Sequence, residues 1–180
     1  MTLELLIALT LFALVSSITP GPNNLMLMAS GVNFGFKRTI PHMLGVALGF
    51  TLMVALVGIG LVQVFDLYPA SYDVLKVCSV FYLLFLAYKI ANAAAPQGEG
   101  NSSGKPFTFI QAALFQWVNP KAWTMALTAS AVYSPTHTVA ASGLVALVFG
   151  IVNLPCISVW TLLGTRVRAL LISARRLRAF

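Results

Sequence analysis

Five long apolar runs, separated by short polar segments, constrain this chain more than any other feature. They span residues 5–36, 40–64, 74–95, 107–132 and 139–164. About 20 helical residues are needed to cross the ~30 Å hydrocarbon core of a bilayer. The runs therefore predict an all-α polytopic membrane protein with five transmembrane helices.

The composition supports this class and excludes others. Of the 180 residues, 59% are hydrophobic and only 8% are charged, whereas soluble domains are about one-quarter charged. A soluble enzyme, a disordered chain and a DNA-binding domain are therefore excluded. The net charge of +7 indicates no nucleic-acid partner, because the basic residues flank apolar runs, where they act as topology signals.

Neither a cleaved leader nor a disulfide is predicted. The first run follows Glu4, with no Lys or Arg before it and no small-residue cleavage site after it. Cys78 and Cys156 both lie inside apolar runs. We interpret them as small buried hydrophobic residues and expect no disulfide, metal site or cofactor.

The distribution of Lys and Arg predicts the orientation in the membrane. If the segment after the first run is cytoplasmic, nine basic residues lie on that side and Lys76 alone lies on the other, while Lys121 falls within a run. Cytoplasmic segments are enriched in Lys and Arg, so we predict an outside N-terminus and cytoplasmic residues after 165. The nine residues are Lys37, Arg38, Lys89, Lys105, Arg166, Arg168, Arg175, Arg176 and Arg178.

Proline clusters interrupt the first and fourth runs, near Pro20 and Pro120. Each broken run is followed by unbroken runs, so the chain reads as two repeats that each begin with a broken span. Because three spans per repeat is an odd number, the second repeat would sit inverted in the membrane, as in many secondary transporters. We predict a first repeat at 1–95, a cytoplasmic loop at 96–106 and a second repeat at 107–180. The pattern also predicts a sixth span, which the sequence lacks. Either the chain is truncated after its last residue or it departs from this architecture.

Each break predicts a helix N-terminus near the middle of the membrane. Non-helical backbone at that depth is tolerated only where protein or a water-filled cavity surrounds it. Helix N-termini carry free N–H groups and a partial positive charge, which suit a carboxylate. A simple proline kink is the alternative at either break. The predicted substrate-binding residues are Thr19, Pro20, Gly21, Pro22, Asn23 and Asn24 at the first break, and the N-cap Asn119, Pro120 and Lys121 at the second.

Lys121 is the only ionisable residue well inside a run. An intramembrane ionisable residue is functional by default, and the alternative is a lysine that snorkels to the interface. Asn153, in the fifth run, is a further candidate to bind substrate. His42, near the cytoplasmic end of the second run, is either a proton carrier or an interfacial histidine.

The chain carries four motifs in order: Thr19–Asn24, Gly35–Arg38, Gly45-x3-Gly49, which predicts close helix packing, and Phe115–Lys121. Together they resemble the LysE-type (lysine exporter) family of amino-acid translocators, in particular its threonine/homoserine and cysteine/O-acetylserine exporter branch. The resemblance extends to about Arg178. It implies a bacterial inner-membrane exporter driven by the proton gradient, with six spans in two inverted repeats.

Charge narrows the expected substrate. The lysine-exporting branch of the family carries an acidic residue in the second span, and residues 42–49 contain none here. A dibasic substrate would also place a second positive charge beside Lys121. We therefore expect export of a small neutral amino acid or a close metabolite by proton antiport, with Lys121 or His42 as the proton carrier.

Two other kinds of function compete with transport. A membrane subunit or scaffold that acts only with a partner is the alternative, and it would explain the five-span count. An enzyme is not expected, because the runs hold no clustered acids, bases or metal ligands. The expected partners are an amino-acid substrate and the lipid bilayer, and a homo-oligomer is compatible with either function.

Overall fold

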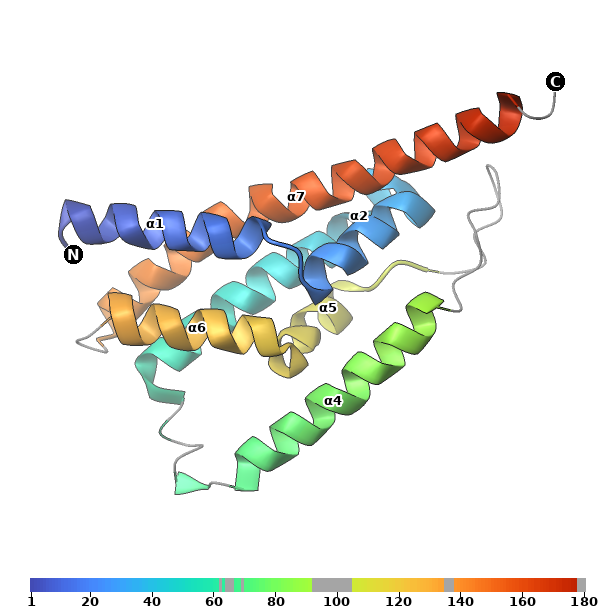
Figure 1. Cartoon of the computed structure of the whole chain (residues 1–180). Coiled ribbons are helices and arrows are strands. Elements are labelled where there is room, and N and C mark those ends of the chain that lie inside the picture. The colour runs from blue at the N-terminus through green and yellow to red at the C-terminus, as the bar shows by residue number, and fades with distance from the viewer. Residues whose placement is uncertain (62, 64–66, 69, 92–104, 135–137, 178–180) are drawn as a thin grey trace.

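The computed structural model describes residues 1–61, 63, 67–68, 70–91, 105–134 and 138–177, and these residues contain helices but no strand (Figure 1). The described part of the chain is therefore all-α, as the apolar runs predict. The elements are α1 (Leu3–Ile18), α2 (Pro22–Leu56), the π-helical turn η1 (Val57–Leu61), α4 (Ala70–Ala91), α5 (Phe109–Phe115), the 3-10 turn η2 (Gln116–Val118), α6 (Pro120–Tyr133) and α7 (Val139–Leu177).

Helix α2 consists of two helices that run in opposite directions and meet at Gly35. Gly35 has φ 78° and ψ 169°, a conformation that glycine adopts because it lacks a Cβ. The hydroxyls of Ser30 and Thr39 lie 2.9 Å apart across this reversal, and the Thr39 hydroxyl donates to the Gly35 carbonyl. The segment expected around Lys37 and Arg38 is therefore a tight reversal and not an extended loop (Figure 1).

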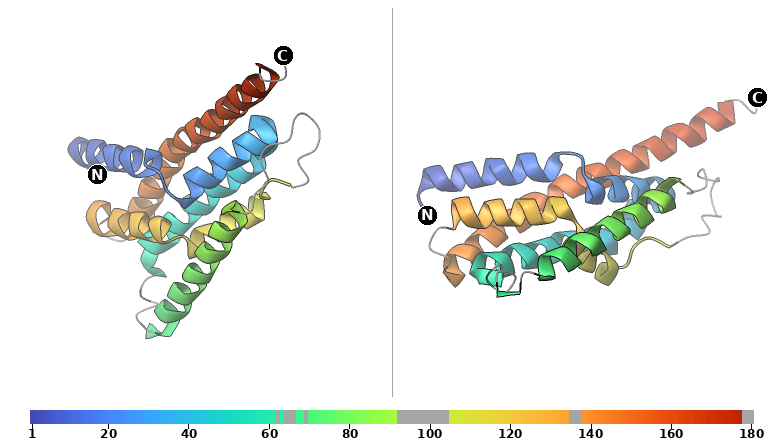
Figure 2. Two further views of the ribbon diagram at one scale, coloured as in Figure 1. Left: turned by 45° about the vertical axis from the view of Figure 1, so that its right-hand side comes forward. Right: turned by 60° about the horizontal axis from the view of Figure 1, so that its bottom comes forward.

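Helix α7 packs along both halves of α2. A Cβ on Gly164 would collide with the Met28 carbonyl oxygen, and a Cβ on Gly31 would collide with the Thr161 carbonyl oxygen. Small residues permit this close approach of helix backbones, which favours association in a membrane. The views in Figure 2 show α7 extending beyond the other helices at its C-terminal end.

The Gly45-x3-Gly49 spacing marks a contact between α2 and α5. A Cβ on Gly45 would lie 2.7 Å from the Ala112 Cβ, and a Cβ on Gly49 would lie 2.6 Å from the Ala113 Cα. The prediction that these glycines mark close helix packing is therefore confirmed. The contact holds α5, and thus the second break that follows it, against α2.

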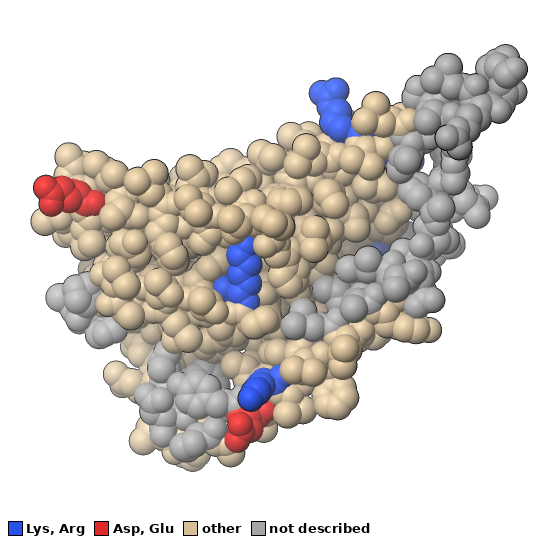
Figure 3. Space-filling model, in the orientation of Figure 1, with Lys and Arg blue, Asp and Glu red and all other residues tan. Residues whose placement is uncertain are grey.

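Among the described residues, two helical stretches are long and apolar enough to cross a membrane by length and composition, and the first of them includes the reversal at Gly35. They are Pro22–Leu61, with a mean hydropathy of 2.3, and Val139–Leu170, with a mean hydropathy of 2.1; α1 and Phe109–Val118 are shorter apolar helices. Uncharged atoms cover most of the face in Figure 3, apart from the grey region. Large apolar side chains are exposed on several helices, including Phe81, Leu147 and Ile151. Extensive exposed apolar surface is typical of a membrane or protein contact.

Several details differ from the expectations. Helix α7 continues to Leu177, beyond the end of the fifth apolar run at residue 164, so that Arg166 and Arg168 lie on the same helix as the run. Cys78 is exposed and only Cys156 is buried, because Cys78 lies on the outer face of α4; both thiols are free. Residues 96–104 of the predicted loop, and Arg178, lie outside the described residues.

Candidate functional site

The first break leaves backbone carbonyls without helical partners, those of Thr19 and Pro20 among them. Helix α1 ends at Ile18, and Thr19 and Gly21 are extended before α2 begins at Pro22. The carbonyls at the end of a helix lack intrahelical donors. Those of Thr19 and Pro20 therefore need donors from elsewhere in the protein, and the partial negative charge of the helix end favours a cation there.

The same break leaves a helix N-terminus open. Pro22 occupies the first helical position, as predicted, and the N-cap Gly21 has no side chain that accepts a hydrogen bond. Asn23 and Asn24 fill the first turn of α2. The N–H groups of this first turn are thus available to a ligand acceptor.

The second break is built by local capping. Asn119 is extended, and its side-chain oxygen accepts a 3.1 Å hydrogen bond from the Lys121 N–H. Pro120 takes the first helical position of α6, where its missing N–H costs nothing. The predicted roles of Asn119 as N-cap and of Lys121 in the first turn are confirmed.

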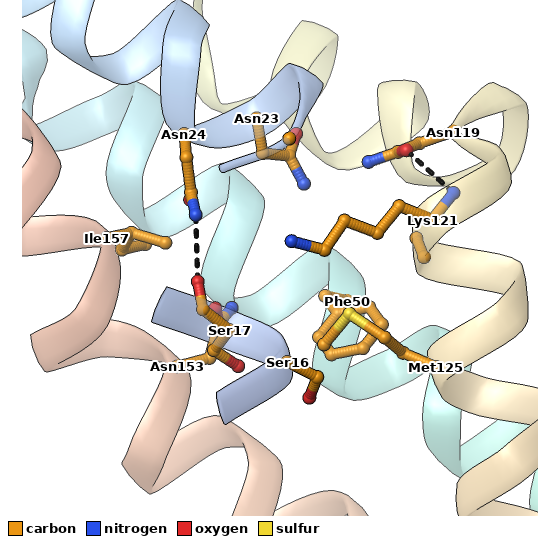
Figure 4. A pocket seen from close by; sticks show the side chains of 12 residues that line it. Ser16, Ser17, Asn23, Asn24, Phe50, Asn119, Lys121, Met125, Asn153 and Ile157 are labelled. Atoms are coloured by element: carbon orange, nitrogen blue, oxygen red, sulfur yellow. Dashed lines mark hydrogen bonds between the residues drawn. The ribbon is translucent and has the colours of Figure 1, made fainter. Parts of the chain in front are cut away.

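The Lys121 side chain joins the two breaks. Its ammonium donates to the Thr19 carbonyl at 2.7 Å, to the Thr19 hydroxyl at 2.9 Å and to the Pro20 carbonyl at 3.4 Å. A Cβ on Gly21 would lie only 2.7 Å from the Lys121 Cδ, so glycine leaves room for the lysine to cross the break. Figure 4 shows this side chain reaching from α6 into the cavity.

Two side-chain amides make a second link between the breaks. Asn23 Nδ2 donates to Gln116 Oε1 at 2.8 Å, and Gln116 Nε2 donates back to Asn23 Oδ1 at 3.2 Å. Gln116 is fully buried and also donates to the Ala112 carbonyl. Asn24 Nδ2 donates to the carbonyls of Ser17 and Thr19. The amides hold the unwound backbone in place, because each free carbonyl or amide in this apolar interior is costly without a partner.

A small cavity lies where the breaks meet (Figure 4). Its volume of about 30 Å³ is room for roughly two water molecules. Thr19 and Pro20 are exposed, so the cavity opens at the molecular surface beside the end of α1. The residues that line it are Ser16, Ser17, Gly21, Asn23, Asn24, Phe50, Asn119, Lys121, Ala122, Met125, Asn153 and Ile157.

Six of the eleven predicted site residues line this cavity: Gly21, Asn23, Asn24, Asn119, Lys121 and Asn153. Thr19, Pro20, Pro22 and Pro120 belong to the breaks but are not among the lining residues, and His42 lies elsewhere. Asn153 lines it from α7, although it is 34 residues away from Asn119 along the chain. His42 does not line it: the ring is 1% exposed, stacks on Phe107 at 5.3 Å, and has no hydrogen-bond partner on either nitrogen among the described residues. Helix α2 therefore turns His42 into the protein and away from the cavity.

The structure adds residues that the sequence did not single out. Gln116 is the partner of Asn23, and its position just before the second break was the only available signal. Trp160 Nε1 donates to the Ile18 carbonyl at 2.9 Å and so caps the end of α1 from α7. The Ser17 hydroxyl is buried beside the cavity without a hydrogen-bond partner in the described chain.

Comparison with known proteins shows the family of the chain. Residues 14–179 match the family described as LysE type translocator. The chain belongs to this family. As a LysE-type translocator it is a membrane transport protein and not an enzyme.

Curated relatives give a more specific likeness. Proteins from Escherichia coli (strain K12), Shigella sonnei (strain Ss046) and Shigella flexneri serotype 5b (strain 8401) are each 33% identical over 147 residues, covering 81% of this chain and 73% of the relative. Each of these relatives is named a cysteine/O-acetylserine efflux protein. No solved structure shows significant similarity to this LysE-type translocator.

Proposed function

We propose that this translocator exports small neutral amino acids and close metabolites, of the cysteine and O-acetylserine kind, across the bacterial inner membrane by proton antiport. The observation that carries the proposal is the Lys121 ammonium held on the Thr19 oxygens at the meeting of two helix breaks. Three helix ends converge there. The C-terminal end of α1 carries a partial negative charge, and the N-terminal ends of α2 and α6 carry partial positive charges. Such a site matches the two charges of an amino-acid zwitterion.

The carboxylate of the substrate would bind at the positive side of the site. The first turn of α2, after Gly21, offers N–H groups without a side-chain cap, and Lys121 offers a full positive charge. The substrate ammonium would bind the carbonyls of Thr19 and Pro20. Asn153 and the unpartnered Ser17 hydroxyl, both at the cavity wall, would contact the substrate side chain.

A neutral side chain fits this site better than a basic one. Lys121 already supplies a positive charge, and all three of its partners are uncharged oxygens. A second cation would be repelled in a low-dielectric cavity. The relatives are named cysteine/O-acetylserine efflux proteins, which supports the same substrate class.

We further propose two inverted repeats, with the N-terminus outside and the residues after 165 cytoplasmic. In Figure 1 the chain passes through the first break from α1 to α2 and through the second from α5 to α6 in roughly opposite directions. Gly35, at the reversal beside Lys37 and Arg38, lies against Arg168: a Cβ there would be 3.7 Å from the guanidinium. These basic residues gather at one end of the molecule, as the positive-inside rule requires of the cytoplasmic end.

Efflux from proteoliposomes tests the function. The chain is reconstituted with labelled cysteine, O-acetylserine, threonine and lysine inside, and release is followed with and without a proton gradient. We expect export of the neutral substrates and not of lysine, dissipation by an uncoupler, and loss of export in both Lys121→Ala and Asn119→Ala. Lys76→Ala, on the exposed face of α4, is the matched control and should export normally. Equal release of all substrates, or none, would refute the proposal.

We assign proton coupling to Lys121, the one ionisable side chain among the residues that line the cavity. The Lys121→Arg variant keeps a positive charge at this position, but an arginine guanidinium does not release its proton in proteins. Binding of substrate should survive this change, while export should lose its dependence on the proton gradient. If Lys121→Arg still exports in a pH-driven manner, Lys121 is not the carrier.

A further inference from the structure

We infer that the Lys121 ammonium occupies the subsite for the substrate ammonium, so that only a ligand carrying both an ammonium and a carboxylate can displace it. The inference rests on the proposed function and adds a determinant of specificity. It assigns Lys121 two positions, one on the Thr19 oxygens without substrate and one on the substrate carboxylate.

The three oxygens around Lys121 form a complete ammonium site. The Thr19 carbonyl, the Thr19 hydroxyl and the Pro20 carbonyl lie 2.7, 2.9 and 3.4 Å from Nζ, and a primary ammonium has three N–H groups to donate. Both carbonyls belong to residues just beyond the end of α1, where a cation is favoured. The Thr19 carbonyl is also fixed by Asn24 Nδ2 at 2.8 Å. Nothing in this oxygen set is specific to a lysine side chain.

Lys121 lies across the cavity in the substrate-free protein and reduces the space open to a ligand. The cavity volume of about 30 Å³ holds roughly two water molecules. The lysine side chain runs directly over Gly21. A Cβ on Gly21 would lie 3.2 Å from Lys121 Nζ. Movement of this side chain therefore opens both the space and the oxygens that the substrate needs.

The cavity wall also holds a polar group that awaits a partner. Ser17 is 4% exposed, and its hydroxyl has no hydrogen-bond partner in the described chain. Buried polar groups are normally satisfied, so this hydroxyl points to a ligand that the substrate-free protein lacks. Asn153, which is 5% exposed, places its side-chain amide at the same wall.

Displacement of the Lys121 ammonium leaves the net charge of the site unchanged only when the incoming ligand is a zwitterion. The incoming ammonium replaces the lysine ammonium on the three oxygens, and the carboxylate neutralises the lysine that has left them. An amine without a carboxylate would leave two cations together with no anion, which is unfavourable in a low-dielectric site. The lysine thus excludes simple amines of the same size.

Binding to the purified, detergent-solubilised chain tests this inference, with cysteine and its decarboxylated analogue cysteamine as probes. The wild-type chain should bind cysteine and should bind cysteamine far more weakly. Lys121→Met removes the charge and frees the oxygens, so cysteamine affinity should rise on the order of tenfold or more, the worth of a charge-assisted hydrogen bond, while cysteine affinity falls. Lys76→Met is the control and should behave as wild type.

A second variant keeps the test independent of the folding of Lys121→Met. Gly21→Ala places a methyl group against Lys121 Cδ and should weaken the hold of Lys121 on the Thr19 oxygens, which raises cysteamine binding while Lys121 is retained.

Equal binding of cysteine and cysteamine to the wild type, or no gain of cysteamine binding in either variant, would overturn the inference and leave the proposed function intact. Displacement of cysteamine by sodium chloride but not by choline chloride would assign the oxygens to a metal ion and also overturn it. No binding of any amino acid to the wild type would instead overturn the proposed function.

Discussion

The Lys121 ammonium donates a 2.7 Å hydrogen bond to the Thr19 carbonyl, although the two residues are 102 positions apart in the chain. The bond joins two groups that an apolar environment cannot satisfy. One is a carbonyl left over where α1 ends, and the other is a cation on the first turn of α6. Each is costly alone, and together they tie the two helix breaks to each other.

The amide pair between Asn23 and Gln116 predicts a measurable energetic coupling between the breaks. Either single change to Ala leaves one amide partly unsatisfied, the buried Gln116 or the half-buried Asn23, which costs about 1–3 kcal/mol. The double variant should therefore lose less stability than the sum of the two single variants, with a coupling energy of roughly 0.5–3 kcal/mol. Thermal unfolding in detergent of the four proteins measures it. The exposed Gln63→Ala should leave the midpoint unchanged, and strict additivity would contradict the link.

Two glycines of α7 should respond in opposite ways to the same change. A Cβ on Gly164 would collide with backbone atoms of Met28, so Gly164→Ala should destabilise the protein by about 1–3 kcal/mol. Gly143 has nothing within 4 Å of its Cβ position, and Gly143→Ala should stabilise the helix by roughly 0.5–1 kcal/mol. The midpoints of thermal unfolding are compared in the same detergent. A similar shift for both variants would show that α2 and α7 do not touch at Met28.

The N-cap of α6 should depend on a side-chain acceptor at position 119. Asn119 is 2% exposed, and its oxygen accepts from the Lys121 N–H. Asn119→Ala should cost about 0.5–2 kcal/mol and misplace Lys121, so that both stability and export fall. Asn119→Ser retains an acceptor and should restore most of the stability. If serine is no better than alanine, capping is not the role of Asn119.

His42 should be dispensable for export. Its ring stacks on Phe107, and both nitrogens are buried without a partner in the described residues. His42→Phe keeps the ring contact and removes two unsatisfied polar atoms, which should raise the unfolding midpoint by the equivalent of about 1 kcal/mol or more. Uncoupler-sensitive export in proteoliposomes should persist. Loss of the dependence on the proton gradient in this variant would transfer the coupling role from Lys121 to His42.

Local chemistry was sufficient to predict the class of the protein and the two breaks. Apolar runs of membrane-spanning length predict helices because lipid offers no partner to a free backbone N–H or C=O. Proline at the first helical position, with Asn119 before Pro120, is a signal carried within a few residues. Glycines four apart predicted the contact of α2 with α5 for a similar reason, since their effect depends only on helix periodicity.

The partners across the breaks were decided by the tertiary structure. Nothing in the sequence pairs Lys121 with Thr19 or Asn23 with Gln116, because each pair is brought together by how α5 and α6 dock on α1 and α2. The burial of His42 and the cap that Trp160 places on Ile18 depend on docking in the same way. Helix formation and capping are short-range and can be read from neighbouring residues, whereas the choice of a distant partner depends on the packing of the whole helix bundle.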